Sequence, residues 1–419
     1  MTEGASAASR SDGGHRRGDP AYRRMLLALF FAGVATFAQL YSPQALLPDI
    51  AETLGVTPAT SALVLSFSTI GLAIGVLPWT VVSDRIGRVR AMAISIASAS
   101  LLGALVSFAD SLPLLIAGRF VEGLLVAGVP AVVIAFLSEE VHAGDAARAA
   151  GTYVAGTSIG GLSGRLIAGP VGEALGWRVG VLSVALVCMI AAAAFIALVP
   201  ASRRFGGVGG LEELEGLGRA PTDAPHSVTR RILSNLRSPR LLALYAQGFL
   251  LMGGFVALYN YLSFRLTGPG FDLSPTLVTL IFLAYLAGTW SSGVSGGIAA
   301  RRGRLAVLLA GIAALILGTL VTLGDSVPVI IVGLVIATAG FFAAHSIASG
   351  WTGQVTDGVG RAQTAGLYNV AYYAGSSLFG WLGGILFVSA GWPGVVVLVV
   401  GLAALAAGLA LAVLRRPMR

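Results

Sequence analysis

Charged residues are scarce in this 419-residue sequence. They make up 11% of the chain, whereas a typical soluble domain has about a quarter. Lysine is absent, so all 27 basic residues are arginine. So few charges cannot cover the surface of two or three soluble domains of this total length. The single cysteine, Cys188, excludes an intrachain disulfide, and we expect its thiol to be an ordinary buried apolar group.

Motifs for soluble chemistry are missing as well. The sequence contains no Walker A loop, no G-x-S-x-G element and no group of His and Cys at metal-ligand spacing. We therefore expect no enzyme activity, no cofactor and no bound metal.

Long apolar stretches are abundant instead: 56% of the residues are hydrophobic, and the mean hydropathy is +0.86. Stretches of about 20 apolar residues recur, each long enough to cross a bilayer core of about 30 Å. They predict an all-helical membrane protein with about twelve spans. The expected spans are 25–46, 60–82, 91–108, 112–137, 149–171, 179–199, 241–264, 276–298, 305–323, 327–349, 362–388 and 394–414.

The arginines are distributed unevenly among the loops between these stretches. With the N-terminus inside, 23 arginines fall in cytoplasmic segments, Arg178 and Arg265 fall outside, and Arg119 and Arg165 fall within spans. This positive-inside asymmetry predicts a multi-pass protein of the inner (plasma) membrane with both termini cytoplasmic. A nucleic-acid partner is not expected, because it would need arginines clustered on one soluble face.

The two halves of the chain repeat each other at a fixed offset. Residues 109–118 resemble residues 324–333, and Gly176-Trp177 resembles Gly391-Trp392, each pair 215 residues apart. Such a repeat predicts two parallel six-helix bundles with a substrate site between them at the membrane midplane. The expected organisation is a disordered tail over 1–24, a first bundle over 25–199, a cytoplasmic linker over 200–240, a second bundle over 241–414 and a short tail over 415–419.

Glu122 is the one acidic residue expected in the middle of a span. A charge at that depth costs about 2.5–3.5 kcal/mol on insertion scales, so it faces a cavity or a partner. Arg119 lies three residues earlier, on the same helix face. Either Glu122 exchanges a proton with Arg119 tuning its acidity, or the two form a permanent pair that only holds the fourth span. We expect proton coupling, with Glu122 beside the gap between the halves.

Short cytoplasmic loops join the second and third spans of each half. Their candidate gating residues are Asp84, Arg85, Gly87, Arg88, Arg301 and Arg304. A carboxylate beside several arginines can pair across the bundle interface in one state and release in another. The alternative is topogenic charge plus a turn at Gly87. In the second half, Ala300 replaces the aspartate.

The fifth span carries a glycine stripe that includes Gly160, Gly164 and Gly169. Its spacing lets another helix approach closely, either as plain packing or as a contact that slides during transport. Arg165 lies inside this stripe. It meets an anionic substrate, pairs with Glu122, or snorkels to the outer surface.

Polar side chains within apolar spans are candidates for lining a substrate cavity. His345 relays protons, binds substrate or is a satisfied core histidine, and Pro43 and Pro48 break the first span. The cavity candidates are Gln39, Tyr41, Gln44, Gln247, Tyr259, Asn260, His345, Asn369, Tyr372 and Tyr373.

Three of these segments resemble signatures of the major facilitator superfamily. Residues 84–88 resemble its loop motif, and residues 119–123 resemble its fourth-span motif Arg-x-x-Gln-Gly with Glu in place of Gln. Residues 160–165 resemble its antiporter motif Gly-x-x-x-Gly-Pro, with Arg165 in place of the proline. The fourth-span arginine of proton-driven members is implicated in proton coupling, so the resemblance implies that role for Arg119.

A narrower resemblance concerns residues 137–140, 160–165 and 340–346, which look like the YnfM-type branch of the drug:proton antiporters. It implies alternating-access, proton-coupled efflux or multidrug transport of a small organic molecule, a drug or metabolite, by a monomer. The alternatives are a proton-coupled importer or facilitator of a sugar or organic acid, and a non-transporting membrane sensor. The substrate itself does not follow from the sequence.

Overall fold

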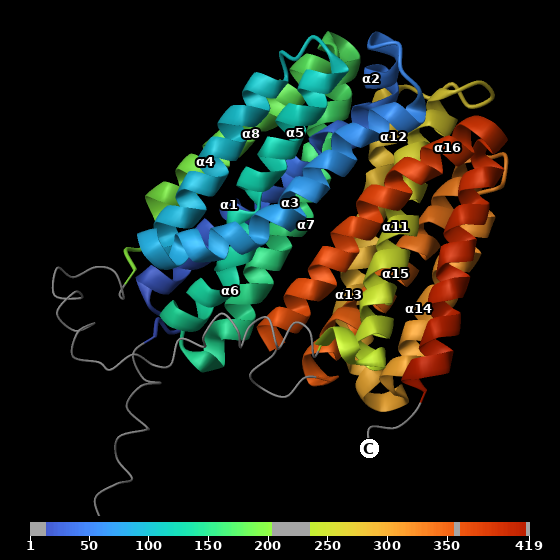
Figure 1. Cartoon of the computed structure of the whole chain (residues 1–419). Coiled ribbons are helices and arrows are strands. Elements are labelled where there is room, and N and C mark those ends of the chain that lie inside the picture. Colours follow the sequence, from blue (N-terminus) through green and yellow to red (C-terminus); the bar gives the residue numbers. More distant parts are fainter. Residues whose placement is uncertain (1–13, 203–234, 356–360, 416–419) are drawn as a thin grey trace, which may run out of the picture.

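The computed structural model describes residues 14–202, 235–355 and 361–415 (Figure 1). Within these ranges the chain is helical, and its one isolated β-bridge joins His15 and Val141. The first half consists of α1 (Pro20–Tyr41), η2 (Ser42–Leu46), α2 (Leu47–Thr53), α3 (Pro58–Ile86), α4 (Arg88–Val106), α5 (Leu112–Val126), α6 (Gly128–Glu140), α7 (Ala143–Leu175) and α8 (Trp177–Leu198). The second half consists of α11 (Pro239–Thr267), α12 (Pro275–Leu280), η3 (Ile281–Ala284), α13 (Tyr285–Arg302), α14 (Arg304–Val321), α15 (Val327–Val355), α16 (Arg361–Leu409) and η5 (Ala410–Leu414).

The expected spans correspond to these helices. By length and composition, 10 described segments are apolar enough to cross a membrane. One of them, Gln363–Leu414, covers two expected spans and has non-helical backbone at Gly391. The remaining span is α7, which is rich in glycine and carries Arg165. The predicted all-helical membrane architecture is confirmed.

Helix starts follow from local sequence. Thr57, Ser238 and Ser274 each precede a proline, and each side chain accepts a hydrogen bond from a backbone N–H in the first turn. Pro20 starts α1 in the same way but without a side-chain cap. The first bundle was predicted to begin at residue 25, whereas α1 begins at Pro20, five residues earlier. Most of the predicted tail, residues 1–13, and most of the linker, residues 203–234, lie outside the described residues.

The internal repeat is visible in the turns between helices. Gly87 and Gly303 join the second and third spans of each half, with φ of 92° and 85°. Gly176 and Gly391 join the fifth and sixth, with φ of 89° and 63°. Glycine tolerates this left-handed region because it has no Cβ. Equivalent turns at equivalent positions give the two bundles the same course.

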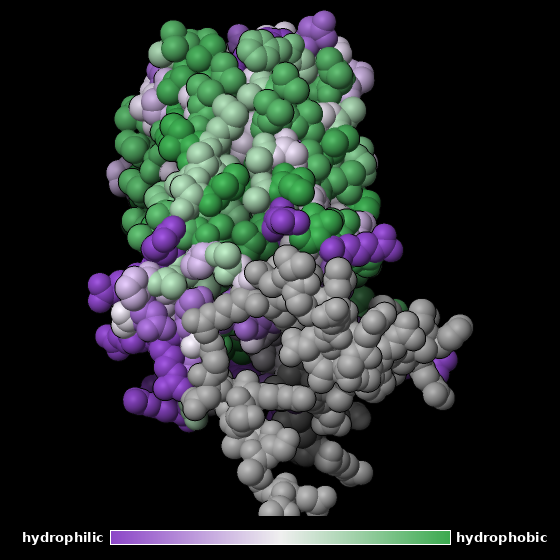
Figure 2. Space-filling view, turned by 90° about the vertical axis from the view of Figure 1, so that its left-hand side faces the viewer, coloured by the Kyte–Doolittle hydropathy of each residue, from purple (hydrophilic) through white to green (hydrophobic). Residues whose placement is uncertain are grey.

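The two bundles converge at one end and diverge at the other (Figure 1). The converging end holds α2 and α12, whereas α8 ends and α11 begins at the diverging end. Each bundle has its own core, and the core of the second also takes in first-half side chains where the bundles meet. Figure 2 shows a broad apolar band over the outer face, with hydrophilic side chains above and below it. Such a band matches the hydrocarbon layer of a membrane.

Candidate functional site

Arg119 and Glu122 form a buried ion pair on α5. The Arg119 Nη1 donates to both Glu122 carboxylate oxygens at 2.7 Å, and the two residues are 0% and 1% exposed. Their spacing of three residues places them on one helix face. The i,i+3 relation read from the sequence thus corresponds to a direct contact.

The same arginine also binds the point where the first span breaks. Pro43 has no N–H to donate to the Gln39 carbonyl, four residues earlier, and there the α-helical turns of α1 give way to η2. Arg119 donates to the Gln39 carbonyl at 3.3 Å and to the Leu40 carbonyl at 2.6 Å. The guanidinium therefore links the Glu122 carboxylate to the broken end of α1.

Glu122 lies inside the first bundle and not beside the gap between the halves. Its carboxylate and the Gln39 side-chain amide meet against Gly103 on α4, where a Cβ would contact both. The expectation that Glu122 faces the gap, and that Gln39 lines the cavity, was wrong. The reason is that Arg119 turns toward the Gln39 and Leu40 carbonyls at the end of α1, which helix packing alone does not reveal.

Arg165 on α7 lies where the halves meet and is 2% exposed. Its Nε donates to the Gln44 Oε1 at 2.7 Å and its Nη1 to the Gly161 carbonyl at 2.5 Å. The guanidinium carbon lies 4.5 Å from the ring centroid of Tyr41 and 4.8 Å from that of Tyr285. Such cation–π contacts stabilise a desolvated cation.

Two of the three interpretations of Arg165 are wrong in this structure. It is buried and so does not snorkel to the surface, and its hydrogen bonds go to Gln44, Gly161 and Tyr285 and not to Glu122. Within the described ranges no carboxylate forms an ion pair with it. Arg165 is thus a buried cation that aromatic rings and neutral acceptors surround.

Hydrogen bonds join the halves around Arg165. Gln44 donates to the Asn260 Oδ1 at 2.7 Å. Ser66 and Ser377 each donate to the other's backbone carbonyl at 3.0 Å, and the Thr69 and Ser377 hydroxyls lie 2.7 Å apart. Sequence reasoning found Gln44 and Asn260 but missed the three hydroxyl residues, because short hydroxyls are common in spans and carry no distinguishing pattern.

A further contact lies at the outer rim of this interface. The backbone N–H of Thr276 donates to the Glu173 Oε2 at 2.8 Å, beyond the predicted end of the fifth span at Val171. Hydrogen bonds from the Thr276 hydroxyl and backbone hold the pKa of Glu173 below its ordinary value. The contact is therefore intact at neutral pH and weakens only as the pH falls through that lowered pKa. Glu173 is not a proton sensor in the neutral range.

Several polar residues of the second half bond within their own bundle. The Gln247 amide donates to the Ala406 carbonyl at 2.9 Å, so the prediction that Gln247 lines the cavity was wrong. The Tyr259 hydroxyl lies 2.7 Å from that of Thr338. Asn369 is exposed. The Tyr259 ring also packs against those of Tyr285 and Phe282, at 4.8 and 5.3 Å between centroids, and both of these rings contact the Arg165 guanidinium, so Tyr259 belongs to the aromatic group around Arg165.

His345 belongs to an aromatic group in the second half. Its Nδ1 lies 2.9 Å from the Tyr368 hydroxyl, and its ring centroid is 4.8 Å from that of Tyr372. Tyr372 in turn packs edge-on against Tyr373 at 5.1 Å. His345 is half-buried, so its ring has a hydrogen-bond partner and an open side. Tyr368 was not among the predicted residues.

Comparison with known proteins decides the family. The model of the Major Facilitator Superfamily matches residues 29–346, more than half of the chain. The chain belongs to the major facilitator superfamily. Its members are transporters, so this protein is a membrane transporter and not an enzyme.

Curated relatives support this assignment over nearly the whole chain. The chain is 38% identical to the inner membrane transport protein YnfM of Escherichia coli, covering 91% of this chain and 88% of the relative. It is 35% identical to the uncharacterized MFS-type transporter YybF of Bacillus subtilis, covering 91% of each. A chloramphenicol resistance protein of Streptomyces lividans is 28% identical over 68% of this chain and 70% of the relative.

Solved structures agree on the fold. A bacterial homologue of the human lysosomal transporter Spinster, inward-facing and occupied, superposes with a TM-score of 0.74 at 15% identity, covering 95% of this chain and 98% of that one. The Escherichia coli xylose transporter XylE, partially occluded and inward open, gives 0.72 at 14% identity, covering 94% and 98%. The two-bundle architecture is therefore that of a major facilitator.

The loop motif of this major facilitator is paired within the first half. The Arg88 guanidinium contacts the Asp84 Oδ1 at 2.5 Å and the Glu139 Oε1 at 3.1 Å, while the Asp84 and Arg85 side chains are exposed. Its second-half counterparts differ: Arg301 is exposed, and Arg304 borders a pocket. In the described residues these ion pairs do not cross between the halves, so a latch stays a prediction for another conformation.

The glycine stripe packs against the first span. A Cβ added to Gly160 or Gly164 would lie 2.5 Å from the carbonyl oxygen of Val34 or Ala38 on α1. A Cβ on Gly169 would meet the Thr279 hydroxyl of the second half. Small residues let helix backbones approach in this way. The stripe holds the helix that carries Arg165 against the helix that carries Gln39 and Gln44.

Gly160→Ala is expected to destabilise the transporter by about 1–3 kcal/mol, because the methyl group must push the α1 backbone away. Gly151→Ala on the same helix is the matched control, since nothing lies within 4 Å of a Cβ there. Thermal unfolding in detergent compares the two variants. Equal stability of both would contradict the close approach.

Proposed function

We propose that this transporter exports a small organic molecule in exchange for protons that enter the cell. It does so as a monomer in the inner membrane, by rocking its two bundles, with both termini in the cytoplasm. With that orientation the converging end is extracellular and the diverging end is cytoplasmic. A proton that crosses a potential of 100 mV gains about 2.3 kcal/mol, which can drive export without ATP.

One observation carries the proposal: Arg119 binds both the Glu122 carboxylate and the broken end of α1. Both Glu122 oxygens accept a hydrogen bond from Arg119, and we assign the deprotonated form of Glu122 to this arrangement. A proton on Glu122 removes the charge that balances Arg119. The α1 carbonyls then become the main acceptors of the guanidinium.

The contacts that hold the two bundles together around Arg165 at the converging end are called the outer closure. The broken end of α1 transmits the protonation of Glu122 to this outer closure. Tyr41 and Gln44 follow Gln39 within five residues, and they are the residues that contact Arg165. Gln44 also donates to Asn260 across the interface. A shift of this segment therefore acts on both bonds that Gln44 makes at the closed end, one of which crosses to the second half. Protonation of Glu122 and opening of the converging end are therefore coupled through one movement of α1.

The named relatives support export more than uptake. One relative is a chloramphenicol resistance protein, and its similarity covers about two thirds of this chain. The family's fourth-span arginine is implicated in proton coupling, and Arg119 occupies its place. A non-transporting sensor is disfavoured by the intact pairing of Arg119, Glu122 and α1.

A second candidate is proton-coupled uptake of an organic acid. One observation favours it: Arg165 is a buried cation without a carboxylate partner among the described residues. An anionic substrate that approaches from the diverging end would be attracted to such a group.

Transport in proteoliposomes separates these functions. A pH gradient is imposed across the vesicle membrane, and a panel of cationic, neutral and anionic compounds is tested. Export predicts uphill substrate movement opposite to the proton flow, and its loss when a protonophore dissipates the gradient. Uphill movement in the direction of the protons identifies an importer, and movement only down the substrate gradient identifies a facilitator. Either result overturns the proposal.

A further inference from the structure

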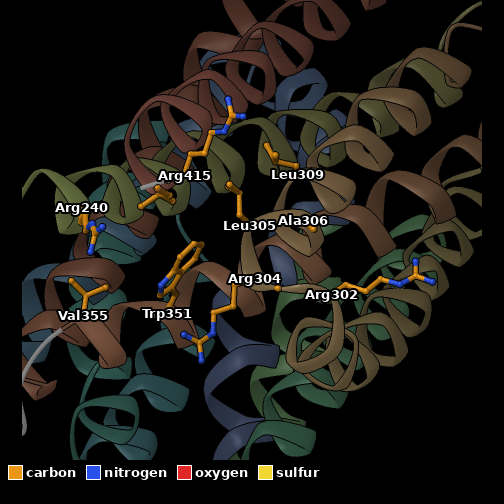
Figure 3. A pocket seen from close by; sticks show the side chains of 11 residues that line it. Arg240, Arg302, Arg304, Leu305, Ala306, Leu309, Trp351, Val355 and Arg415 are labelled. Carbon is orange, nitrogen blue, oxygen red and sulfur yellow. The ribbon is translucent and has the colours of Figure 1, made fainter. Parts of the chain in front are cut away.

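A pocket opens at the diverging end of the second half, away from the interface between the bundles. Its volume is about 600 Å³. Four arginines border it, each from a different element: Arg240 on α11, Arg302 on α13, Arg304 on α14 and Arg415 after η5. Figure 3 shows Arg240, Arg304 and Arg415 around the pocket, whereas the Arg302 side chain points away from them. Acidic residues are absent from its described lining.

The repeat shows that Arg304 differs from its first-half counterpart in its ion pairs with described residues. In the first half, Arg88 contacts Asp84 and Glu139. The corresponding second-half positions, 216 and 215 residues later, are Ala300 and Gln354 around Arg304. Neither can carry a charge, and Arg304 has no ion pair with a described residue. The first half therefore pairs its loop arginine with its own carboxylates, whereas no described carboxylate pairs with Arg304 in the second half.

The rest of the pocket is apolar. Leu305, Leu309, Trp351, Val355 and Leu414 lie between the arginines. Trp351 is half-buried, and Figure 3 shows its ring between Arg240 and Arg304. Tryptophan favours the boundary between headgroups and acyl chains. A basic rim over an apolar floor fits an amphiphilic anion better than a fully hydrated one.

The position of the pocket fits a lipid as well. Helices α11 and α14 begin at this pocket, and α15 and η5 end there, so it lies where the apolar band gives way to the polar end. With the proposed orientation, which this inference shares with the proposed function, that end is the cytoplasmic leaflet. Anionic headgroups gather at basic pockets of this kind between helix ends.

We propose that this pocket binds the phosphate headgroup of an anionic phospholipid of the cytoplasmic leaflet. Arg304 and Arg415 donate to the phosphate oxygens, as guanidinium groups do in charge-assisted pairs. Trp351, Leu305 and Leu309 contact the glycerol and the first acyl carbons. The bound lipid supplies the negative charge that Asp84 and Glu139 supply in the first half.

Native mass spectrometry of the full chain in detergent tests this binding with phosphatidylglycerol, cardiolipin and phosphatidylcholine. The test variant is Arg304→Gln with Arg415→Gln. The matched control is Arg90→Gln with Arg85→Gln, which removes two exposed arginines at the same end of the first half. We expect the test variant to bind the anionic lipids at least about tenfold more weakly, the control to bind them as the native chain does, and phosphatidylcholine to bind weakly throughout.

Three outcomes overturn the proposal. Equal losses of anionic-lipid binding in the test and control variants show that the lipids bind by general attraction to positive charge. Competition by millimolar inorganic phosphate shows a soluble anion site. Binding that appears only after Glu212, Glu213 and Glu215 are changed to Gln shows that the chain's own linker occupies the pocket. Because the readout is binding, a failed transport experiment leaves this test unaffected, and weak lipid binding does not affect proton coupling.

Discussion

Glu122→Gln is expected to abolish accumulation of substrate against a gradient, so that substrate only equilibrates across the membrane. Exchange of external for internal substrate is expected to continue at a rate close to that of the native protein. The physical reason is that an amide cannot take up a proton, yet it still offers Arg119 an oxygen acceptor in the same place. The variant restores the Arg-x-x-Gln motif of the family, so it is expected to fold.

Uphill transport and exchange are measured in the same proteoliposomes with an imposed pH gradient. Glu173→Gln is the matched control, because it removes a carboxylate at the outer rim that remains ionised at neutral pH. The control is expected to keep proton-driven accumulation. If Glu122→Gln accumulates substrate as well as the control does, the carboxylate is a structural pair and another group carries the proton.

Arg165→Met is expected to open the outer closure. The change removes the hydrogen bond from Arg165 to the Tyr285 hydroxyl across the interface and the cation between Tyr41 and Tyr285, and it leaves the Gln44 Oε1 without its donor. A hydrogen bond to a charged group contributes about 1.5–3 kcal/mol, so the outer-closed state loses roughly 10- to 100-fold in population. Uphill transport is expected to fall by a similar factor.

The outer closure is measured with a thiol. Ala62 is fully buried in the core shared by the two halves, and the one native thiol, Cys188, is also buried. Ala62→Cys therefore reports outer opening through its labelling rate with a membrane-impermeant reagent. Labelling is expected to accelerate with Arg165→Met and to stay unchanged with Arg178→Met, which removes an outer arginine that stacks on Trp177. Unchanged labelling in both variants would show that Arg165 acts on substrate alone.

The fold was predictable because membrane solvation acts on every residue of a span. An apolar stretch of bilayer length must be helical, since its backbone polar groups can only pair with one another. The arginine distribution and the repeat then fix the number of bundles and the arrangement within each. The start of α1 was misjudged because Arg23 and Arg24 interrupt the apolar pattern, whereas Pro20 begins the helix.

The site was only partly predictable, because contacts depend on how helices rotate against each other. The Arg119–Glu122 pair followed from spacing along one helix, but its direction depends on the carbonyl that Pro43 leaves free on another helix. Gln247 looked like a cavity residue until α16 supplied the Ala406 carbonyl as its acceptor. Such pairs join residues far apart in the sequence, and one sequence taken by itself gives no signal for them.

The central claim is that the protonation of Glu122 sets the position of the bundles. Distances between spin labels test it directly, with one pair at Arg85→Cys and Arg301→Cys on the diverging end and another at Leu175→Cys and Leu277→Cys on the converging end, all at exposed positions. In the native background, a change from mildly alkaline to mildly acidic buffer is expected to lengthen the distance at one end and to shorten the distance at the other. Both distance distributions are expected to stay fixed when Glu122→Gln is added. A variant that follows the same pH-dependent shift as the native protein would contradict the claim.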